Sequence, residues 1–332
     1  MPTWLSADPK GLLLVFNAMK TLVTGGAGFI GSHLSDALLD RGDEVVIVDD
    51  LSSGSLDNIS SALAAGAELV EGSILDRELM ERTIQRVKPG TVFHFAAQGN
   101  VRHSTDHPVK DAELNVVGTL NMIEASRTIG LDRFVFASSG GAIYGEADEL
   151  PAKESGPTEP LSHYGLSKLA AERYLLLYRR MYMFNSISLR LSNVYGPRQN
   201  PKGESGVISI FGELVRDGKP PVIFGDGGQT RDYVYVDDVV TAILAAAATD
   251  VEGAVNLGSG VETSLLDLLG AIVEATPAAS APLAGDAAPE FLPERRDEVK
   301  RNVLDTSRAG ELLGWGATTP LSTGLTRTLE SL

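Results

Sequence analysis

The feature that most constrains the fold is a glycine-rich turn near the start of the chain. Residues 20–24 (KTLVT) are predicted to form a strand that runs directly into this turn, and a helical pattern follows. In a G-x-x-G-x-x-G spacing, the first glycine permits a sharp turn and the second lets a pyrophosphate approach the backbone. The third lets the helix pack closely on the strand, and the helix N-terminus favours an anion. The pattern therefore predicts a dinucleotide site formed by Gly25, Gly28, Phe29, Ile30 and Gly31.

A pair of acids lies where such a site needs one. The next predicted strand, 44–48 (EVVIV), is followed by Asp49 and Asp50. An acid about 20 residues beyond the glycines binds the ribose hydroxyls, and its charge repels a 2′-phosphate. NAD is therefore favoured over NADP. The competing interpretation is a purely structural turn with a surface acid, and the strand and helix that flank the glycines argue against it.

Short β-branched segments alternate with helical patterns along the first part of the chain. The predicted strands lack alternation of polar and apolar residues, as expected for strands that are covered on both faces. Further strands are predicted at 67–71, 91–95, 133–138 and 186–190, and helices at 31–41, 77–87, 111–129 and 165–182. This order predicts an α/β fold, a Rossmann-type doubly wound parallel sheet with helices on both faces.

From about residue 191 the composition changes. Glycine and proline become frequent, as in GPRQNPKGESG and GKPPVIFGDGG, which indicates longer loops. Residues 276–293, rich in alanine and proline, are predicted to be a linker or surface loop. We expect a dinucleotide-binding domain over 19–190 with a returning segment at about 232–260. A smaller C-terminal α/β substrate lobe would comprise 191–231 and 261–332.

The charge and composition of the chain exclude several kinds of partner. The net charge is −16, so we expect neither nucleic acid nor an anionic membrane to bind. The chain has no cysteine, and its five histidines form no metal-spaced pair, so we expect no metal site. The apolar run 12–16 is too short to span a bilayer, and no basic cluster precedes it. We expect residues 1–18 to be an extension before the fold and the protein to be cytoplasmic.

Tyr164 and Lys168 are candidates for the chemistry. Their i, i+4 spacing on a predicted helix places both side chains on one face. A free tyrosine has a pKa near ~10, but a lysine ammonium and a nicotinamide cation nearby would both favour the phenolate. Tyr-x-x-x-Lys also arises by chance on helix surfaces. Here it follows a dinucleotide turn and a strand that ends in Ser138 and Ser139, which makes Tyr164 the leading candidate for a catalytic base.

This combination resembles the extended short-chain dehydrogenase/reductase family, and within it the UDP-glucose 4-epimerase group of nucleotide-sugar enzymes. The resemblance covers about 19–330. It is carried by TGGAGFIG, VVIVDDLSSG, HFAAQGNV, NVVGTLNMIEAS, YGLSK, NVYGPRQNPKGESGV and GDGGQTRDYVYVDDV. It implies bound NAD, a UDP-sugar substrate and a homodimer built on paired helices, for which 111–129 and 165–182 are candidates.

The resemblance also implies roles for individual residues at the cofactor. Asp49 would hold the adenosine ribose, and Ser73, which replaces an aspartate of the family pattern, would make a weaker contact near the adenine. The remaining cofactor contacts would come from Ile74, Phe95, Ala96, Ala97 and Asn115, the last of them on the nicotinamide side.

On the substrate side, the resemblance implies that Arg231 and Arg295 grip the diphosphate, a role that suits the planar fork of a guanidinium. From the residues alone, Arg295 and Arg296 would be a solvated charged loop, and the resemblance changes that interpretation for Arg295. The other implied substrate contacts are Asn193 near the phosphates, Glu298 at the uridine ribose, and Val222 and Phe224 at the uracil.

The implied reaction is epimerisation at C4 of a UDP-hexose through a transient 4-keto sugar, with UDP-glucose or UDP-galactose as the favoured substrate. A 4,6-dehydratase or a UDP-glucuronate decarboxylase would carry an acid in the stretch Gly140-Gly141-Ala142, so both are disfavoured. A UDP-glucuronate 4-epimerase tends to carry an arginine where this chain has Asn200, which favours a neutral hexose. UDP-N-acetylglucosamine 4-epimerase stays an alternative. A non-catalytic NAD-binding sensor would be free to lose Tyr164 or Lys168, and both are present.

One position departs from the family pattern. Aligned backwards from Tyr144 and Gly145, the hydroxyl that many such epimerases use falls on Gly140. Ser139 is therefore the candidate that would replace it, and Ser138 is a weaker one. We expect Ser139→Ala to lower turnover less than Tyr164→Phe does.

Overall fold

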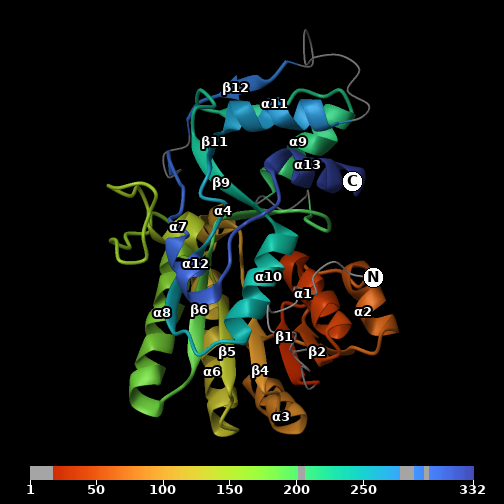
Figure 1. Cartoon of the computed structure of the whole chain (residues 1–332), viewed down its shortest axis with the longest axis vertical. Helices are drawn as coiled ribbons and strands as arrows, with labels where there is room; N and C mark the ends of the chain where they lie inside the picture. Colours follow the sequence, from red (N-terminus) through yellow and green to blue (C-terminus); the bar gives the residue numbers. More distant parts are fainter. Residues whose placement is uncertain (1–17, 201–205, 277–287, 295–298) are drawn as a thin grey trace, which may run out of the picture.

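A computed structural model describes residues 18–200, 206–276, 288–294 and 299–332 of the chain (Figure 1). Its central element is a sheet of seven parallel strands. The strands are β1 (Lys20–Thr24), β2 (Glu44–Asp49), β3 (Glu68–Glu71), β4 (Thr91–His94), β5 (Arg133–Ser139), β6 (Ser186–Leu191) and β10 (Gly253–Leu257). Their order across the sheet is β10-β6-β5-β4-β1-β2-β3, the doubly wound order expected from the sequence. Each of the first six ends within one residue of its predicted bounds.

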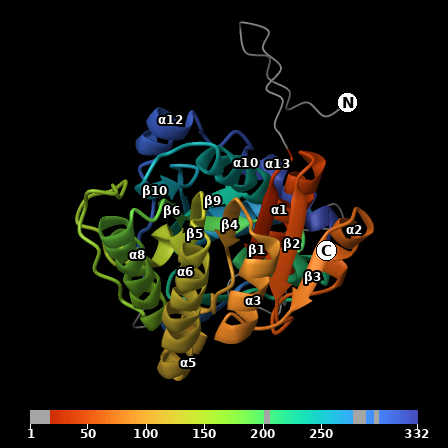
Figure 2. The same ribbon diagram turned by 90° about the horizontal axis from the view of Figure 1, so that it is seen from below.

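Helices cover both faces of this sheet (Figure 2). One face carries α1 (Phe29–Asp40) and α10 (Val236–Ala247), and the other carries α3 (Arg77–Val87), α6 (Thr119–Thr128) and α8 (His163–Tyr182). Strand β5 shows why its sequence lacks alternation. Phe134 and Phe136 pack into the core beneath α6 and α8, whereas Val135 and Ala137 pack into the core on the α1 and α10 side. Both faces are apolar because both are buried.

The helix expected over 111–129 is interrupted. It consists of α5 (Pro108–Ala112), a π-helical turn η2 (Glu113–Gly118) and α6. The chain approaches its neighbours closely here, because a Cβ on Gly118 would lie 2.5 Å from a methyl carbon of Ile74. Irregular turns of this kind often accompany functional positions, and this one contains Asn115. The remaining short helices near this part of the sheet are η1 (Asp57–Ile59), α2 (Ser60–Ala64), α4 (Val101–Asp106) and α7 (Gly140–Ile143).

A second set of elements lies beyond the carboxyl ends of the strands (Figure 1). Strands β7 (Asn193–Tyr195), β9 (Thr230–Tyr235) and β11 (Glu262–Ser264) form a three-stranded sheet, and β8 (Val222–Phe224) pairs with β12 (Glu290–Leu292). Helices α9 (Val207–Arg216), α11 (Leu265–Ala275) and α13 (Leu321–Glu330) pack together beside them. Two details differ from the sequence expectation. Strand β12 lies within the expected loop, and α12 (Ser307–Leu313) packs against β10 and α10 instead of the second lobe.

Residues 302–305 join the second part to the first. The side chain of Asn302 donates to the carbonyl of Gly140 (3.1 Å), and the backbone N–H of Leu304 donates to Asp232 (3.2 Å). The backbone of Ala152 pairs with both Val303 and Asp305. One short segment late in the chain therefore contacts α7, the loop after it and β9 at the same time.

A buried ion pair lies behind β5. Arg190 of β6 donates to both carboxylate oxygens of Glu172 on α8 (3.1 and 2.8 Å). Ser138 donates to the same carboxylate, and Tyr144 accepts from Arg190 and donates to Asn256 (2.8 and 2.6 Å). Because every member of this network has a hydrogen-bond partner, it can be buried without leaving a bare charge.

Candidate active site

The glycine-rich turn joins β1 to α1 at the carboxyl edge of the sheet. Gly25 has φ +68°, a conformation that favours glycine, and a Cβ there would lie 2.6 Å from the backbone nitrogen of Ala96. A Cβ on Gly31 would lie 2.2 Å from the carbonyl oxygen of Gly25. Helix α1 begins after Gly28, which has no side chain to cap it, so no side chain of the N-cap residue satisfies the N–H groups of the first turn. The turn therefore has the shape of an anion cradle, with Phe29 and Ile30 as the first residues of the helix.

The two acids that follow β2 lie in different surroundings. The carboxylate of Asp49 accepts from the backbone N–H groups of Ala27 and Leu51, both at 2.9 Å, and it is 8% exposed. Burial raises the pKa of Asp49, and the two backbone hydrogen bonds oppose that rise. Asp50 is exposed and accepts from the backbone of Ser52 (3.0 Å). The structure thus brings Asp49 to the glycine turn and leaves Asp50 facing solvent.

The expected cofactor-lining residues follow β3 and β4. Ser73 accepts a hydrogen bond from the backbone of Leu75 (3.3 Å), and the side chain of Ile74 is 2% exposed in the core beneath α3 and α6. Phe95, Ala96 and Ala97 are half-buried directly after β4. Among them, Ala96 lies beside Gly25. The segment after β4 therefore forms a wall next to the cradle.

A buried histidine fixes this wall to the sheet. The Nδ1 atom of His94 lies 2.8 Å from the hydroxyl of Thr24, and its Nε2 atom lies 2.9 Å from the hydroxyl of Thr119. Thr24 also accepts from the backbone of Ala96 (3.2 Å), and Thr119 donates to the carbonyl of Asn115 (2.7 Å). These directions assign the ring proton to Nε2. Burial lowers the pKa of His94 to about 3, so the ring is neutral.

Tyr164, Lys168 and Ser139 converge at the end of β5. The hydroxyl of Ser139 lies close enough to the phenol of Tyr164 to lower its pKa. The ammonium of Lys168 donates to the carbonyl of Ala137 (2.9 Å) and lies over the ring of Phe136. Residues 137 and 139 are two apart on a strand and 164 and 168 are four apart on a helix, so each pair presents one face. The sequence expectation that Tyr164 and Lys168 share a face is therefore consistent with the structure.

Burial controls the protonation of both groups. It raises the pKa of Tyr164, an effect that the hydroxyl of Ser139 opposes and the nearby charge of Asp111 increases. Burial lowers the pKa of Lys168 to about 8, an effect that the charges of Asp111 and Glu172 oppose. The ammonium of Lys168 is thus buried with its charge retained near neutral pH. It is placed to favour a phenolate on the same helix face.

The stretch around Gly140 departs from the sequence alignment. A Cβ on Gly140 would lie 2.6 Å from a methyl carbon of Leu304 and 3.1 Å from the carbonyl of Arg190. A side chain at this position would therefore point into packed protein and not toward Tyr164. Ser139 already occupies the position beside Tyr164, and the hydroxyl of Ser138 is committed to Glu172 (2.5 Å). No hydroxyl is missing at Gly140, because a side chain there would not face the site.

Asn115 lies in the π-helical turn, but its polar atoms bond to protein. Its side-chain oxygen accepts from the backbone of Gln98 (2.8 Å). Its side-chain nitrogen lies 3.0 Å from the carbonyl of Gln98, 3.1 Å from Asp111 and 3.0 Å from Ser167. Asn115 is 1% exposed. Its side chain therefore holds the segment after β4 against α5 and α8, and a direct contact with nicotinamide stays a prediction.

The expected substrate residues come from the second part of the chain. Asn193 opens β7, and its side-chain oxygen would lie 3.5 Å from a Cβ on Gly141. Arg231 lies on β9 beside β11, and its guanidinium donates to the carbonyl of Thr230 (2.8 Å). Val222 and Phe224 lie half-buried on β8. Arg295 and Glu298 lie outside the described residues, so their roles stay predictions from the sequence.

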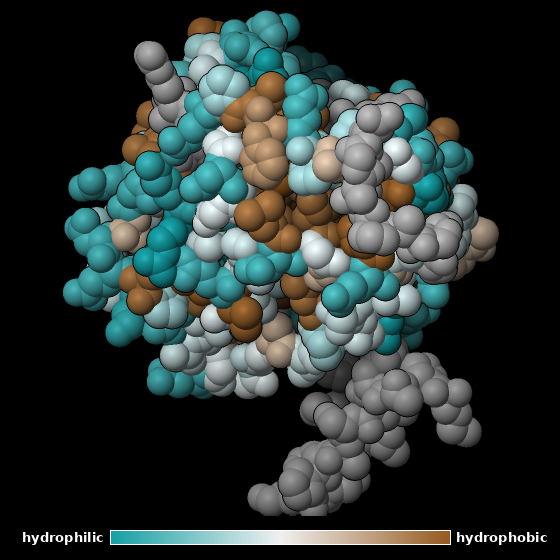
Figure 3. Space-filling model, turned by 90° about the horizontal axis from the view of Figure 1, so that it is seen from above, coloured by the Kyte–Doolittle hydropathy of each residue, from teal (hydrophilic) through white to brown (hydrophobic). Residues whose placement is uncertain are grey.

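Apolar side chains are exposed on this part of the molecule. Figure 3 shows the face seen from above, where apolar residues gather near the centre with polar residues around them. Large exposed apolar residues of the second lobe are Val261, Leu266, Phe291 and Leu292.

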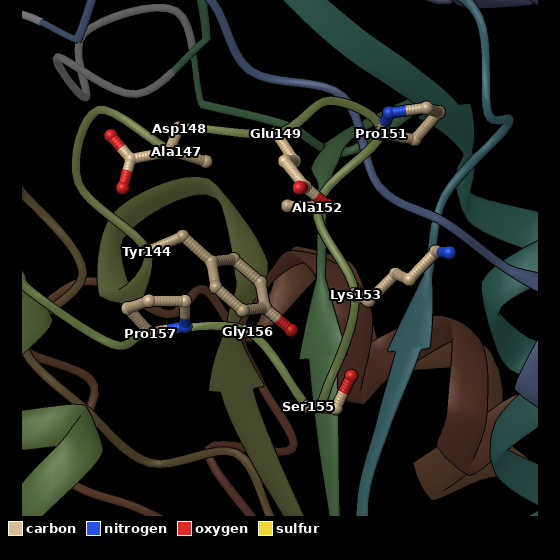
Figure 4. Close-up of a pocket in the computed structure, with 10 residues that line it drawn as sticks. All are labelled: Tyr144, Ala147, Asp148, Glu149, Pro151, Ala152, Lys153, Ser155, Gly156 and Pro157. Carbon is tan, nitrogen blue, oxygen red and sulfur yellow. The ribbon is translucent and has the colours of Figure 1, made fainter.

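A separate hollow of about 380 Å³ lies in the loop after α7 (Figure 4). It is lined by Tyr144, Ala147, Asp148, Glu149, Pro151, Ala152, Lys153, Ser155, Gly156 and Pro157. The hydroxyl of Tyr144 is bonded to Arg190 and Asn256. The lining includes none of the residues expected at the cofactor or the sugar, so this hollow is distinct from the candidate site.

Sequence reasoning missed three polar residues near the site. Asp111 and Gln98 bond to each other and to Asn115 of the π-helical turn, and Glu172 bonds to Arg190 of β6. For Asp111 a signal exists, because it precedes Asn115 by four residues, one helical turn on the same face. In the described part of the chain, no group of three or more His, Cys, Asp or Glu side chains could hold a metal ion. Similarly, none of the helices built from described residues is long and apolar enough to cross a membrane.

Comparison with known proteins defines the class. A model of the NAD dependent epimerase/dehydratase family matches residues 21–258, and the chain belongs to this family. It is 45% identical over 314 residues to UDP-glucose 4-epimerase of Mycolicibacterium smegmatis, an alignment that covers 94% of this chain and 98% of the relative. The fold class and the NAD dependence expected from the sequence are confirmed.

Two solved structures extend this comparison. UDP-glucose 4-epimerase of Thermotoga maritima with UDP-glucose superimposes with a TM-score of 0.89 at 42% identity, covering 94% of this chain and 98% of that one. UDP-glucose 4-epimerase of Thermus thermophilus in complex with NAD gives a TM-score of 0.86 at 40% identity, with the same coverage.

Proposed function

We propose that this protein is a UDP-hexose 4-epimerase that uses NAD and has UDP-glucose and UDP-galactose as its preferred substrates. The observation that carries the proposal is the convergence of Tyr164, Lys168 and Ser139 at the end of β5, at the same carboxyl edge of the sheet as the glycine turn. Relatives that align over nearly the whole chain are UDP-glucose 4-epimerases, which supports the same activity here.

The residues at the carboxyl edge fit a dinucleotide. A pyrophosphate would lie against the backbone at Gly28, and Asp49, which accepts from the backbone of Ala27 in the same turn, would bind the adenosine ribose. Phe95, Ala96 and Ala97 line the adjoining wall. When bound, NAD would supply a reversible hydride acceptor for C4, chemistry that no side chain of the protein provides.

Tyr164 acts as the acid and base in the proposed reaction. Its phenolate accepts the proton of the sugar O4 as C4 becomes a ketone, and it returns the proton when C4 becomes an alcohol again. Lys168 would supply positive charge that favours the phenolate. The nearby hydroxyl of Ser139 lowers the pKa of Tyr164 and would donate to the phenolate. The 4-keto sugar turns between these two steps, so the hydride returns to the opposite face.

Gly141 leaves space for this turn. A Cβ at Gly141 would lie 3.5 Å from the side-chain oxygen of Asn193 and 3.9 Å from the hydroxyl of Ser139, so position 141 faces both groups. An acid at this position would lie beside the sugar, where it could serve an elimination step. The absence of a side chain at 141 therefore favours epimerisation over dehydration.

The nucleotide would be held by the second lobe. Asn193 and Arg231 lie on neighbouring parts of one sheet, where they would bind the phosphates. Val222 and Phe224 would flank the uracil, and Arg295 and Glu298 are the further contacts expected from the sequence. A hold on the diphosphate permits the sugar to rotate without leaving the site.

Incubation of the purified protein with UDP-galactose and no added NAD tests the proposal. We expect UDP-glucose to form with no net release of NADH, because the cofactor is regenerated in each cycle. A lack of UDP-glucose together with net NADH release would show a dehydrogenase instead. A panel of UDP-glucose, UDP-N-acetylglucosamine and UDP-glucuronate then separates the hexose activity from the two alternative substrates.

The proposed active form is a homodimer. Helix α8 carries a stripe of exposed apolar residues, Leu166, Leu177 and Met181, and the adjoining α5 and η2 carry Val109 and Val117. These five side chains are between 45% and 69% exposed. Apolar faces of this kind mark protein interfaces. The cytoplasmic location expected from the sequence stays a prediction.

A further inference from the structure

Asp111 is an unusual buried acid beside the candidate site. It lies in the last turn of α5 and is 1% exposed. One carboxylate oxygen accepts from the side chains of Gln98 (2.9 Å) and Asn115 (3.1 Å). The other oxygen has no hydrogen-bond partner among the atoms of the described residues. Burying an acid that is not paired with a base is unfavourable for folding, so a role in function would account for it.

The charged groups around Asp111 come mainly from α8. This helix packs against α4, α5 and η2. The side-chain nitrogen of Asn115 donates both to Asp111 (3.1 Å) and to Ser167 (3.0 Å), which lies between Tyr164 and Lys168 on α8. The titratable groups that α4, α5 and η2 contribute besides Asp111 are all exposed: Arg102, His103, Asp106, His107, Lys110 and Glu113. Ser104 is buried and uncharged.

Neighbouring groups cannot replace Asp111. Glu172 also acts on Lys168, but its carboxylate is bound on both oxygens by Arg190. His94 is neutral, because burial lowers its pKa to about 3. Ser139 carries no charge. Glu172 is thus paired with Arg190, whereas Asp111 forms no ion pair with any basic side chain of the described residues.

We propose that Asp111 is a positioning residue that sets the charge state of the Tyr164 and Lys168 pair. Its carboxylate is the counter-ion that keeps Lys168 protonated inside the protein. The same charge holds Tyr164 in its neutral form until a cation or a substrate hydroxyl arrives beside it. The inference rests on the proposed 4-epimerase function, in which Tyr164 must exchange a proton with the sugar.

The sign of the effect follows from the charge. An anion stabilises the protonated form of any neighbouring group, so removal of Asp111 lowers the pKa of both Tyr164 and Lys168. In kcat/KM, the acidic limb reports the loss of phenolate and the alkaline limb reports the loss of ammonium. Both limbs are therefore expected to move to lower pH together, a pattern that a general loss of packing would not produce.

Asp111→Asn tests the proposal, because its amide keeps the shape and an acceptor oxygen but loses the charge. We expect both limbs of the kcat/KM profile for UDP-galactose to shift by about one pH unit toward acid. The matched control is Asp106→Asn on α4, which removes the same charge from an exposed position and should leave both limbs in place. Equal profiles for Asp111→Asn and the parent, or an equal shift in the control, would overturn the proposal.

A second measurement does not depend on turnover. The phenolate of Tyr164 is titrated by ultraviolet difference absorbance, as the signal of each protein minus that of its Tyr164→Phe counterpart. The midpoint should fall by about one pH unit on going from the parent to Asp111→Asn. If no UDP-sugar is turned over, the proposed function fails while this titration still decides the role of Asp111. Asp111→Ser applies the same test with a smaller side chain should the Asn variant fail to fold.

Discussion

The hydroxyl of Ser139, the last residue of β5, lies beside the phenol of Tyr164 in the first turn of α8. This hydroxyl favours the phenolate and opposes the effect of burial on the pKa of Tyr164. It also joins the strand that carries the carboxyl edge of the sheet to the helix that carries Lys168. The proton chemistry proposed for the site depends on this contact.

Removal of the Ser139 hydroxyl should weaken the base without abolishing it. We expect Ser139→Ala to lower kcat about ten-fold and to move the acidic limb of the profile to higher pH, because a lost hydrogen bond raises the pKa of Tyr164. Tyr164→Phe should lower kcat by about a hundred-fold to ten thousand-fold. The neighbouring Ser138→Ala is the control, since Ser138 bonds to Glu172. Equal losses for Ser139→Ala and Tyr164→Phe would contradict this assignment.

Gly31→Ala should abolish the cofactor cradle. Its Cβ would lie 2.2 Å from the carbonyl of Gly25, so the turn must open or the helix must move. We expect the purified variant to lose most of its bound NAD, as measured by release on denaturation and by the quenching of protein fluorescence on titration. Gly270→Ala, on the exposed side of α11 where a Cβ meets nothing within 4 Å, should keep NAD. Retention of NAD by Gly31→Ala would count against the cradle.

The buried His94 should make stability depend on pH. Its folded-state pKa, about 3, is below the ordinary value of 6.5, so the unfolded chain binds more protons between these pH values. The free energy of unfolding should therefore fall as pH decreases from 6.5 toward 3. His94→Gln should show a smaller fall over that range in urea titrations at several pH values. If both proteins lose stability with the same slope, His94 is not the group responsible.

A charge on the apolar stripe of α8 should separate the proposed dimer. Leu177 lies between Leu166 and Met181 in this stripe and is 45% exposed. Leu177→Glu would bury a carboxylate in the interface. We expect the mass in solution, measured by light scattering after size exclusion, to change from that of two chains to that of one. Leu266→Glu alters a similarly exposed leucine on α11 and should leave the mass unchanged. A monomeric parent protein would refute the proposed interface directly.

The parts of the site that the sequence predicts well are local. The glycine turn, the Tyr164 and Lys168 spacing and the six strands follow from periodicity and from residues that are close together in the chain. Residues 111–129 have a helical pattern throughout, and the π-helical turn at 113–118 is not visible in it. The close approach of Gly118 to Ile74 is a tertiary contact, and periodicity carries no information about it.

The error at Gly140 has a similar cause. Counting back from Tyr144 assigns each residue a role by its order, but the direction of a side chain depends on where strand β5 ends and α7 begins. Because the strand continues through Ser139, a side chain at Gly140 would point to Leu304, which is far away in the chain. Glu172 was missed for the same reason, since its partners Ser138 and Arg190 lie on other elements.

The contact between Gly140 and the segment 302–305 bears on how the protein is made. Synthesis proceeds from the N-terminus, and the sheet, Tyr164 and Lys168 all precede this segment. Asn302 and Leu304 supply the backing for Gly140 and the partner for Asp232. A nascent chain, or one truncated before residue 302, thus carries Tyr164 and Lys168 but lacks the side chains that pack against Gly140. The residues proposed for the chemistry are thus synthesised well before the segment that packs behind Gly140.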